Sequence, residues 1–168
     1  MSTFEHETHV TASFAEVWDF HSRISGLTGL TPDWVNMRVE AIRGPEGELA
    51  PELMGPDPGT LTTGCEIDVV VQPFGIGPQQ AWTSRIVERE EREGAAVFRD
   101  EMTAGPFDRW VHSHYFYADN GGTRVRDRIE YRLPGGDLGR LAGPFAVVGF
   151  EPMFRFRHRE TERRLGRS

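Results

Sequence analysis

Hydrophobic and polar residues alternate with a period of two along most of the chain, a pattern typical of half-buried strands. It predicts strands over residues 4–10, 34–43, 64–72, 79–89, 95–102, 108–118 and 123–133. Turn-forming segments at residues 90–94, 103–107 and 119–122 separate the last four, so we expect hairpins there. The pattern therefore predicts an antiparallel sheet of seven strands, the last six of them consecutive.

Helical spacing appears at two places. Ser13 is a suitable N-cap and Glu16 follows three residues later, as in a capping box, which predicts a short helix after the first strand. Residues 25–32 are expected to form a loop or a second short helix. From residue 137 to about residue 165 the pattern becomes helical. The apolar stripe of this last helix contains Leu138, Leu141, Phe145, Val148, Gly149, Met153 and Phe156.

Proline and glycine mark the irregular features. Pro144 and Pro152 are expected to kink or interrupt the last helix. Residues 44–64 are rich in glycine and proline, and we expect a long connection there that could serve as a flap over an opening. No repeat or linker divides the chain, so residues 1–168 are expected to form one domain. Because only the last helix is long enough to cover one sheet face, the fold class is α+β.

Alternation assigns inward faces to three neighbouring strands. These faces carry Val125, Asp127, Ile129 and Tyr131 on one strand, Trp110, His112, His114 and Phe116 on the next, and Phe98, Asp100 and Met102 on the third. If Ala118 pairs with Thr123, His114 lies opposite Asp127. If Met102 pairs with Trp110, Asp100 lies opposite His112, with Cβ atoms about 4.5–5.5 Å apart. We therefore predict two Asp–His pairs on an otherwise apolar wall.

Several roles fit these four ionisable groups. They could form a structural network that fixes strand register. They could anchor a ligand through its hydroxyl, carbonyl or carboxylate groups. In a catalytic version, histidine moves a proton while aspartate orients it, which suits enolisation, aldol cyclisation or dehydration of a ketide-like substrate. His112 and His114 with Asp127 or Asp100 also match the ligand set of a facial triad, but the spacing is only moderately specific and we predict no metal.

Three further residues or segments have alternative interpretations. Trp82 borders the pocket if it faces inward with Ser84 and Ile86, the orientation we adopt; the opposite one would turn Arg85 toward Asp100. Cys65 is the only cysteine, and we interpret it as a small buried hydrophobic residue. The basic run at residues 154–159, with Arg163 and Arg164, is interpreted as a helix end whose arginines complement the helix dipole and pair with Glu160 and Glu162.

The charge and composition of the chain disfavour some classes of binding partner. The chain has 19 basic residues, all arginine, against 26 acidic ones, for a formal net charge of -7. This balance disfavours nucleic acid and anionic lipid, and suggests a halophile or a GC-rich genome. The sequence lacks an apolar run of about 18 residues, so we expect no membrane insertion. The acidic start does not match a signal peptide, which indicates a cytoplasmic protein.

Several short motifs, found in a fixed order along the chain, resemble those of a known protein family. The motifs are the opening pattern from Phe4 to Phe20, then Phe98-Arg99-Asp100-Glu101-Met102, Gly105-Pro106-Phe107, Trp110-x-His112-x-His114-x-Phe116, Gly122-Thr123 and Asp127-x-Ile129-x-Tyr131-x-Leu133-Pro134. Over nearly its whole length the chain resembles the START-like, or helix-grip, superfamily, also called SRPBCC. That superfamily includes polyketide cyclases and dehydrases, coenzyme-Q-binding carriers and pollen-allergen-like proteins. The resemblance implies a curved sheet around a long C-terminal helix with an apolar cavity between them, and no shared catalytic residues.

We therefore predict that the protein binds or transports a small hydrophobic ligand, such as a lipid, a quinone or a polyketide-like molecule. The alternative is a cyclase or dehydrase, a lyase-like enzyme, with His112, His114, Asp100 and Asp127 as catalytic candidates. A third interpretation is a protein-interaction module with a vestigial cavity. No cofactor is expected. The expected ligand-binding residues are Trp82, Phe98, Asp100, Met102, Trp110, His112, His114, Phe116, Asp127, Ile129, Phe145 and Met153.

Overall fold

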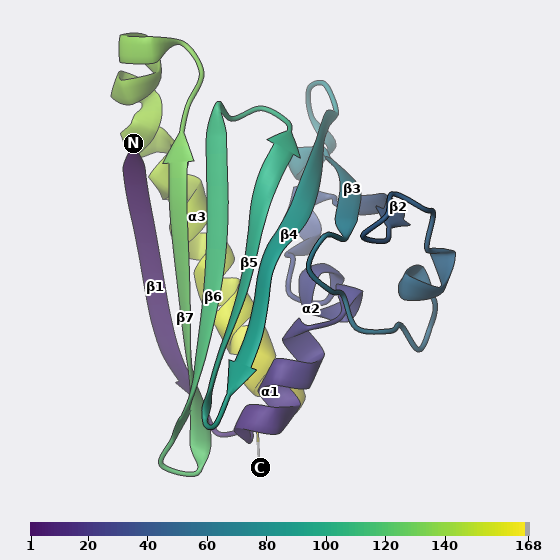
Figure 1. The fold of residues 1–168 in the computed structure, drawn as a ribbon. Coiled ribbons are helices and arrows are strands. Elements are labelled where there is room, and N and C mark those ends of the chain that lie inside the picture. The colour runs from purple at the N-terminus through teal and green to yellow at the C-terminus, as the bar shows by residue number, and fades with distance from the viewer. Residues whose placement is uncertain (167–168) are drawn as a thin grey trace.

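A seven-stranded antiparallel sheet with the order β1-β7-β6-β5-β4-β3-β2 forms one wall of the molecule (Figure 1). The computed structural model describes residues 1–166, apart from the side chains of residues 136–148. The strands are β1 (Ser2–Val10), β2 (Arg38–Arg43), β3 (Glu66–Val71), β4 (Gln80–Arg92), β5 (Ala95–Ala104), β6 (Arg109–Asp119) and β7 (Gly122–Arg132). The predicted α+β fold with its meander of six strands is confirmed, and β1 joins the sheet at its edge, beside β7.

Helices cover one face of this sheet. The long helix α3 (Gly136–Leu165) crosses it diagonally, and α1 (Phe14–His21) and α2 (Ile24–Thr28) lie on the same side (Figure 1). Short 3-10 turns complete the connections: η1 (Asp33–Val35), η2 (Pro51–Met54) and η3 (Pro73–Gly75). The predicted capping box of α1 is confirmed, because Ser13 accepts from the Glu16 amide and the Glu16 carboxylate accepts from the Ser13 amide. No helix in the described chain has the length and apolar content that a membrane crossing requires.

The hairpin registers agree with the turn positions in the sequence. Ala118 pairs with Thr123, which brings His114 opposite Asp127. On the other side of β6, Asp100 lies opposite His112. In β4, Ser84 and Ile86 are buried, so the adopted orientation of this strand is confirmed.

Two hydrophobic clusters form the core. The larger one includes Val125 of β7, with residues from α1, α2 and β3–β6. The smaller one includes Ile129 of β7 and fixes α3 to β1 through Phe4, Phe150 and Phe154. Asp127 lies between Val125 and Ile129 on the same face of β7, so the predicted polar residues occupy the boundary between the two clusters.

Three predicted boundaries were wrong. The strand expected from residue 34 begins at Arg38, because the chain first forms η1 and then takes a left-handed conformation at Asn36 (φ 49°). Residues 90–92 extend β4, so the turn is confined to the next two residues, with Gly94 at φ 69°. The helix α3 runs without a break through Pro152, so of the two effects expected there the interruption is wrong. Packing of Phe150 and Phe154 in the smaller cluster holds the helix on both sides of that proline.

Two further predictions concern the apolar stripe of the last helix and the long connection before β3. Pro144 and the stripe residues Leu138, Leu141, Phe145 and Val148 lie outside the described side chains. Of the long connection at residues 44–64, Leu61 is buried and contributes to the cavity wall described below. The idea that this connection acts as a flap stays a prediction.

Candidate functional site

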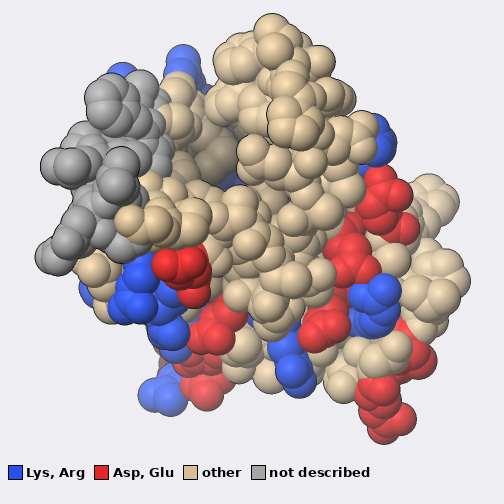
Figure 2. Space-filling view, turned by 90° about the horizontal axis from the view of Figure 1, so that it is seen from above, with Lys and Arg blue, Asp and Glu red and all other residues tan. Residues whose placement is uncertain are grey.

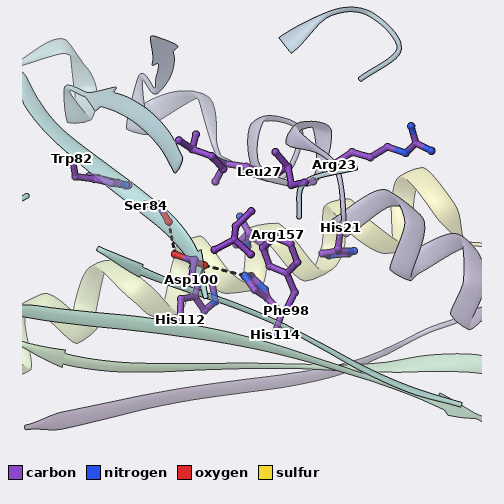
Figure 3. Close-up of a pocket in the computed structure, with 14 residues that line it drawn as sticks. His21, Arg23, Leu27, Trp82, Ser84, Phe98, Asp100, His112, His114 and Arg157 are labelled. Atoms are coloured by element: carbon purple, nitrogen blue, oxygen red, sulfur yellow. Dashed lines mark hydrogen bonds and ion pairs between the residues drawn. The ribbon is translucent and has the colours of Figure 1, made fainter. Parts of the chain in front are cut away.

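Two adjoining chambers lie between the sheet and the helices. The inner chamber has a volume of about 90 Å³ and is lined by residues of β4, β5, β6, α2 and α3 (Figure 3). The outer chamber has a volume of about 250 Å³. Four residues line both chambers, so the chambers adjoin along a shared wall and differ in the rest of their lining; the four are Leu27, Trp82, His112 and Arg157.

The outer chamber is largely apolar and aromatic. Its wall includes Trp34, Trp82, Phe107, Trp110, Phe150, Met153 and Phe154. The rings of Trp110 and Phe150 meet nearly edge to face, with centroids 5.4 Å apart. Seen from above, the described surface beside a hollow is mostly uncharged, and the charged side chains gather along the lower part of the view (Figure 2). Such a wall suits an apolar or aromatic molecule.

Asp127 is the centre of a buried network below the inner chamber. Its side chain is buried on β7 and opposes His6 of β1 and His114 of β6 in the sheet register. His112 Nε2 donates to Asp127 Oδ1 at 2.9 Å, and His158 Nε2 of α3 donates to Oδ2 at 2.6 Å. His114 Nδ1 lies 2.7 Å from Oδ1, but its direction does not make a hydrogen bond.

The network continues to the first strand. His158 Nδ1 lies 2.8 Å from His6 Nδ1. Because His158 donates through Nε2 to a carboxylate, a neutral His158 ring accepts at Nδ1, and His6 is then the donor. One carboxylate thus organises three surrounding histidines directly and a fourth through His158.

Asp100 forms a second acidic position, on the wall of the inner chamber. Its Oδ1 accepts a hydrogen bond of 2.7 Å from Ser84 Oγ (Figure 3). Its Oδ2 lies 3.8 Å from His114 Nε2 and 3.9 Å from His112 Nδ1. These two separations are too long for hydrogen bonds, so Asp100 faces both imidazoles across a gap. The other predicted pair, His114 with Asp127, is in close contact.

Burial and neighbouring charges set the protonation of the network. Burial would raise the pKa of Asp127, but the charge of His114 and hydrogen bonds from the histidines hold that pKa well below its ordinary value. The pKa of Asp100 is also lowered, because His112 and His114 outweigh the effect of its burial. Burial and the nearby His114 lower the pKa of His112, whereas the two carboxylates outweigh burial and raise the pKa of His114.

Arg157 of α3 places a cation on the wall of both chambers. Its side chain is only 7% exposed, and its guanidinium makes no hydrogen bond or ion pair with any residue that the structure describes. Burial lowers its pKa, while Asp127 and Asp100 act in the opposite direction from a longer distance. The guanidinium lies over the Phe154 ring, with Cζ 5.8 Å from the ring centroid. A buried guanidinium without a hydrogen-bond or ion-pair partner is costly, so its N–H groups are suited to an acceptor in the cavity.

The structure brings most of the expected ligand residues to the cavity. Those that line a chamber are Trp82, Phe98, Asp100, Trp110, His112, His114 and Met153. Asp127, Phe116 and Ile129 are buried behind the wall, and Met102 is half-buried away from both chambers. Phe145 lies outside the described side chains.

Sequence reasoning missed the polar residues of α3. The basic run at residues 154–159 is not simply a solvated helix end, because Arg157 and His158 are buried. Glu160 does pair with Arg163 and Arg164, but Glu162 accepts hydrogen bonds from Thr11 instead. The spacing along the helix could have indicated these positions, because the buried residues recur every three or four positions; they are Phe150, Phe154, Arg157, His158 and Thr161. The predicted apolar stripe included Phe156 instead, which is only half-buried.

Comparisons with known proteins agree with this architecture. Residues 10–155 match the family model described as polyketide cyclase / dehydrase and lipid transport. No curated protein matches the chain.

Solved structures share the fold at low sequence identity. A Thermus thermophilus protein is 16% identical with a TM-score of 0.64, and the alignment covers 98% of this chain and 97% of that one. Norcoclaurine synthase from Thalictrum flavum, in complex with dopamine and hydroxybenzaldehyde, is 15% identical with a TM-score of 0.62 and coverage of 96% and 84%. Ginseng major latex-like protein 151 from Panax ginseng is 12% identical with a TM-score of 0.60 and coverage of 98% and 97%.

Proposed function

Because this chain belongs to the polyketide cyclase / dehydrase and lipid transport family, we propose that it binds one small, largely apolar molecule in its two-chamber cavity. The apolar part of the ligand fills the outer chamber and its polar end reaches the inner one. The observation that carries this proposal is the difference in lining between two adjoining chambers. The inner one is bordered by Ser84, Asp100 and His114, whereas the outer one is bordered mainly by apolar and aromatic side chains.

The volumes limit the size of the ligand. An apolar cavity of about 150 Å³ is large enough for benzene. The outer chamber, at about 250 Å³, therefore accommodates one or two fused rings or a short branched chain. The inner chamber, at about 90 Å³, has room for a small polar group or a few water molecules. These volumes favour a compact aromatic or ketide-like molecule over a two-chain lipid.

Arg157 selects the polar end of this molecule. Its side chain lies on the wall of both chambers, and its guanidinium has no hydrogen-bond or ion-pair partner among the described side chains. A ligand carboxylate or ionised enol would form charge-assisted hydrogen bonds with it and offset its buried charge. We therefore expect an anionic ligand to bind more tightly than its neutral ester.

Calorimetric titration of the whole protein with 2-naphthoate and with methyl 2-naphthoate tests this proposal. A hydrogen bond to a charged group contributes about 1.5–3 kcal/mol, so Arg157→Gln should weaken naphthoate binding by at least about tenfold. The ester should bind equally to both proteins. Arg159→Gln is the matched control, because Arg159 is exposed two residues further along α3. Absence of binding for both probes, or an equal loss in the control, would contradict the proposal.

Ligand already present after purification gives a second test. Native mass spectrometry of gently purified protein, followed by organic extraction, should find a compact molecule that carries an acidic group. Recovery of a two-chain lipid from the folded protein would contradict the size limit derived from the chambers.

A cyclase or dehydrase is the second candidate function, and the facing pair of histidines favours it. The pKa of His112 is lowered and that of His114 is raised, so one ring is suited to accept a proton and the other to donate one. Both line the inner chamber, where the polar end of the ligand would lie. An acid–base pair of this kind suits enolisation of a bound ketone.

Deuterium exchange into benzoylacetone, followed by NMR, tests this second candidate. The protein should accelerate exchange at the carbon between the two carbonyls, and His112→Gln should remove the acceleration without removing probe binding. Equal exchange rates for the protein, the variant and buffer alone would leave ligand binding as the function and exclude this acid–base role.

A further inference from the structure

We propose that Asp100, His112 and His114 form a binding site for one divalent transition-metal ion at the wall of the inner chamber. The inference goes beyond ligand binding and does not depend on the identity of the ligand. Two imidazoles and one carboxylate are a donor set that suits Zn²⁺ or Fe²⁺. In the described part of the chain, this is the one group of three such side chains whose donor atoms lie within 4.8 Å of one another.

The distances fit an ion better than they fit hydrogen bonds. Asp100 Oδ2 lies 3.9 Å from His112 Nδ1 and 3.8 Å from His114 Nε2. With the third separation at most 4.8 Å, the point in their plane equidistant from the three atoms lies about 1.9–2.5 Å from each, against about 2.0–2.2 Å for zinc bonds to nitrogen and oxygen. A shift of at most a few tenths of an ångström would complete the coordination.

The orientation of the rings directs lone pairs toward this point. His112 uses Nε2 to donate to Asp127, so the Nδ1 atom of its neutral ring carries a lone pair that faces Asp100. His114 turns Nδ1 toward Asp127 and Nε2 toward Asp100. Once His114 has lost its proton, three donor atoms therefore converge across a gap that a single proton cannot bridge. A cation placed there would bind all three.

The residues behind the ligands form the outer support that metal sites require. Asp127 contacts the far nitrogen of both rings, at 2.9 Å from His112 and 2.7 Å from His114. Ser84 holds the remaining oxygen of Asp100 by a hydrogen bond of 2.7 Å. A carboxylate behind a ligating histidine fixes the ring and increases its basicity.

The charge balance of the chamber also allows a divalent ion. Asp100 and Asp127 supply two negative charges, which equal the charge of the ion. Arg157 then remains as the nearby cation on the wall, and it is the group that an anionic ligand would neutralise. Binding of the ion requires His114 to lose its proton, and the site keeps an open side toward the chamber because all three ligands come from the sheet.

Zinc titration of the whole, chelator-treated protein by calorimetry tests the site. We expect one ion per chain, and we expect Asp100→Asn and His114→Gln to weaken binding by about 100-fold or more. Asp127→Asn, behind the ligands, should weaken it by about 10–100-fold. His9→Gln is the control, since His9 lies on β1 and bonds the Asp119 carbonyl away from the chamber. Circular dichroism checks that each variant is folded.

Nitrogen-15 NMR of the histidine rings gives a sharper result that needs no variant. Zinc should coordinate Nδ1 of His112 and Nε2 of His114, which are opposite atoms of the two rings. Failure of the folded protein to take up zinc at a hundredfold excess would overturn the proposal, as would coordination through the other two nitrogens. Binding that survives in Asp100→Asn and disappears in His9→Gln would place the ion elsewhere.

A bound ion also occupies the lone pair that the acid–base role of His112 needs. Occupancy of the site by the ion therefore decides whether His112 acts as a metal ligand or as an acid–base group.

Discussion

Replacing Asp127 by asparagine tests whether the buried network stabilises the fold. The substitution preserves the size of a side chain that is 2% exposed and lies between the two hydrophobic clusters. It removes the negative charge that accepts from His112 Nε2 and His158 Nε2. The amide also turns two N–H groups toward donors, so at least one ring nitrogen loses its acceptor.

The expected loss follows from the cost of breaking a buried ion pair, which is about 3–5 kcal/mol when one partner is removed. Domains are commonly stable by about 5–15 kcal/mol, so the variant should remain folded but become marginal. With a urea dependence of about 2 kcal/mol per molar, the unfolding midpoint should fall by about 1.5–2.5 M.

Urea unfolding at pH 7 with a chelator present, followed by tryptophan fluorescence and circular dichroism, measures this loss. Asp119→Asn is the control, because its carboxylate at the end of β6 bonds only locally with Asn120 and approaches Arg124 at 4.0 Å. The control should lose less than about 0.5 kcal/mol. A double-mutant cycle with His158→Gln should show a coupling of about 1 kcal/mol or more. A loss below about 1 kcal/mol for Asp127→Asn, or one equal to the control, would refute the reasoning.

Three further predictions address other parts of the cavity. Burial lowers the pKa of His21 to about 3, and His21 borders the inner chamber. As pH falls from about 6.5 toward 3, the unfolded ring takes a proton that the folded ring refuses, so the protein should lose up to about 1.4 kcal/mol per pH unit relative to His21→Asn. Urea unfolding at pH 7 and pH 5 checks this, and equal losses in both proteins would contradict it. Phe154→Ala should cost about 3–5 kcal/mol in the same assay, and the half-buried Phe156→Ala clearly less, because Phe154 is 1% exposed and packs on Phe4. If zinc occupies the proposed site, its removal by a chelator should lower the melting temperature of the protein but not that of Asp100→Asn; an equal shift in both would argue against the site.

Local patterns predict the sheet and one wall of the site. Period-two alternation and the turn at residues 119–122 are sufficient to place His114 opposite Asp127, because hairpin register depends on adjacent residues. The same argument cannot reach His6, although it also opposes Asp127. The strand β1 joins β7 from the far end of the chain, and no turn connects the two strands to set their register.

The polar residues of α3 escaped prediction for a different reason. Arg157 and His158 stand in a run of alternating basic and aromatic residues, where charge normally indicates solvent. They are buried because Asp127 accepts from His158 and because the cavity adjoins Arg157. Such burial depends on partners distant in sequence, so a hydrophobicity pattern assigns these positions to the wrong face.

The link from His6 through His158 to Asp127 joins residues that are 152 positions apart along the chain. Each ring in this series has its tautomer set by its neighbour, so no member can be replaced alone without leaving a donor facing a donor or an acceptor facing an acceptor. Among descendants of this protein, we therefore expect these positions to be inherited or exchanged as a group. A lineage that lost the aspartate would soon replace the histidines with apolar residues, and its first strand and last helix would then be held together by packing alone.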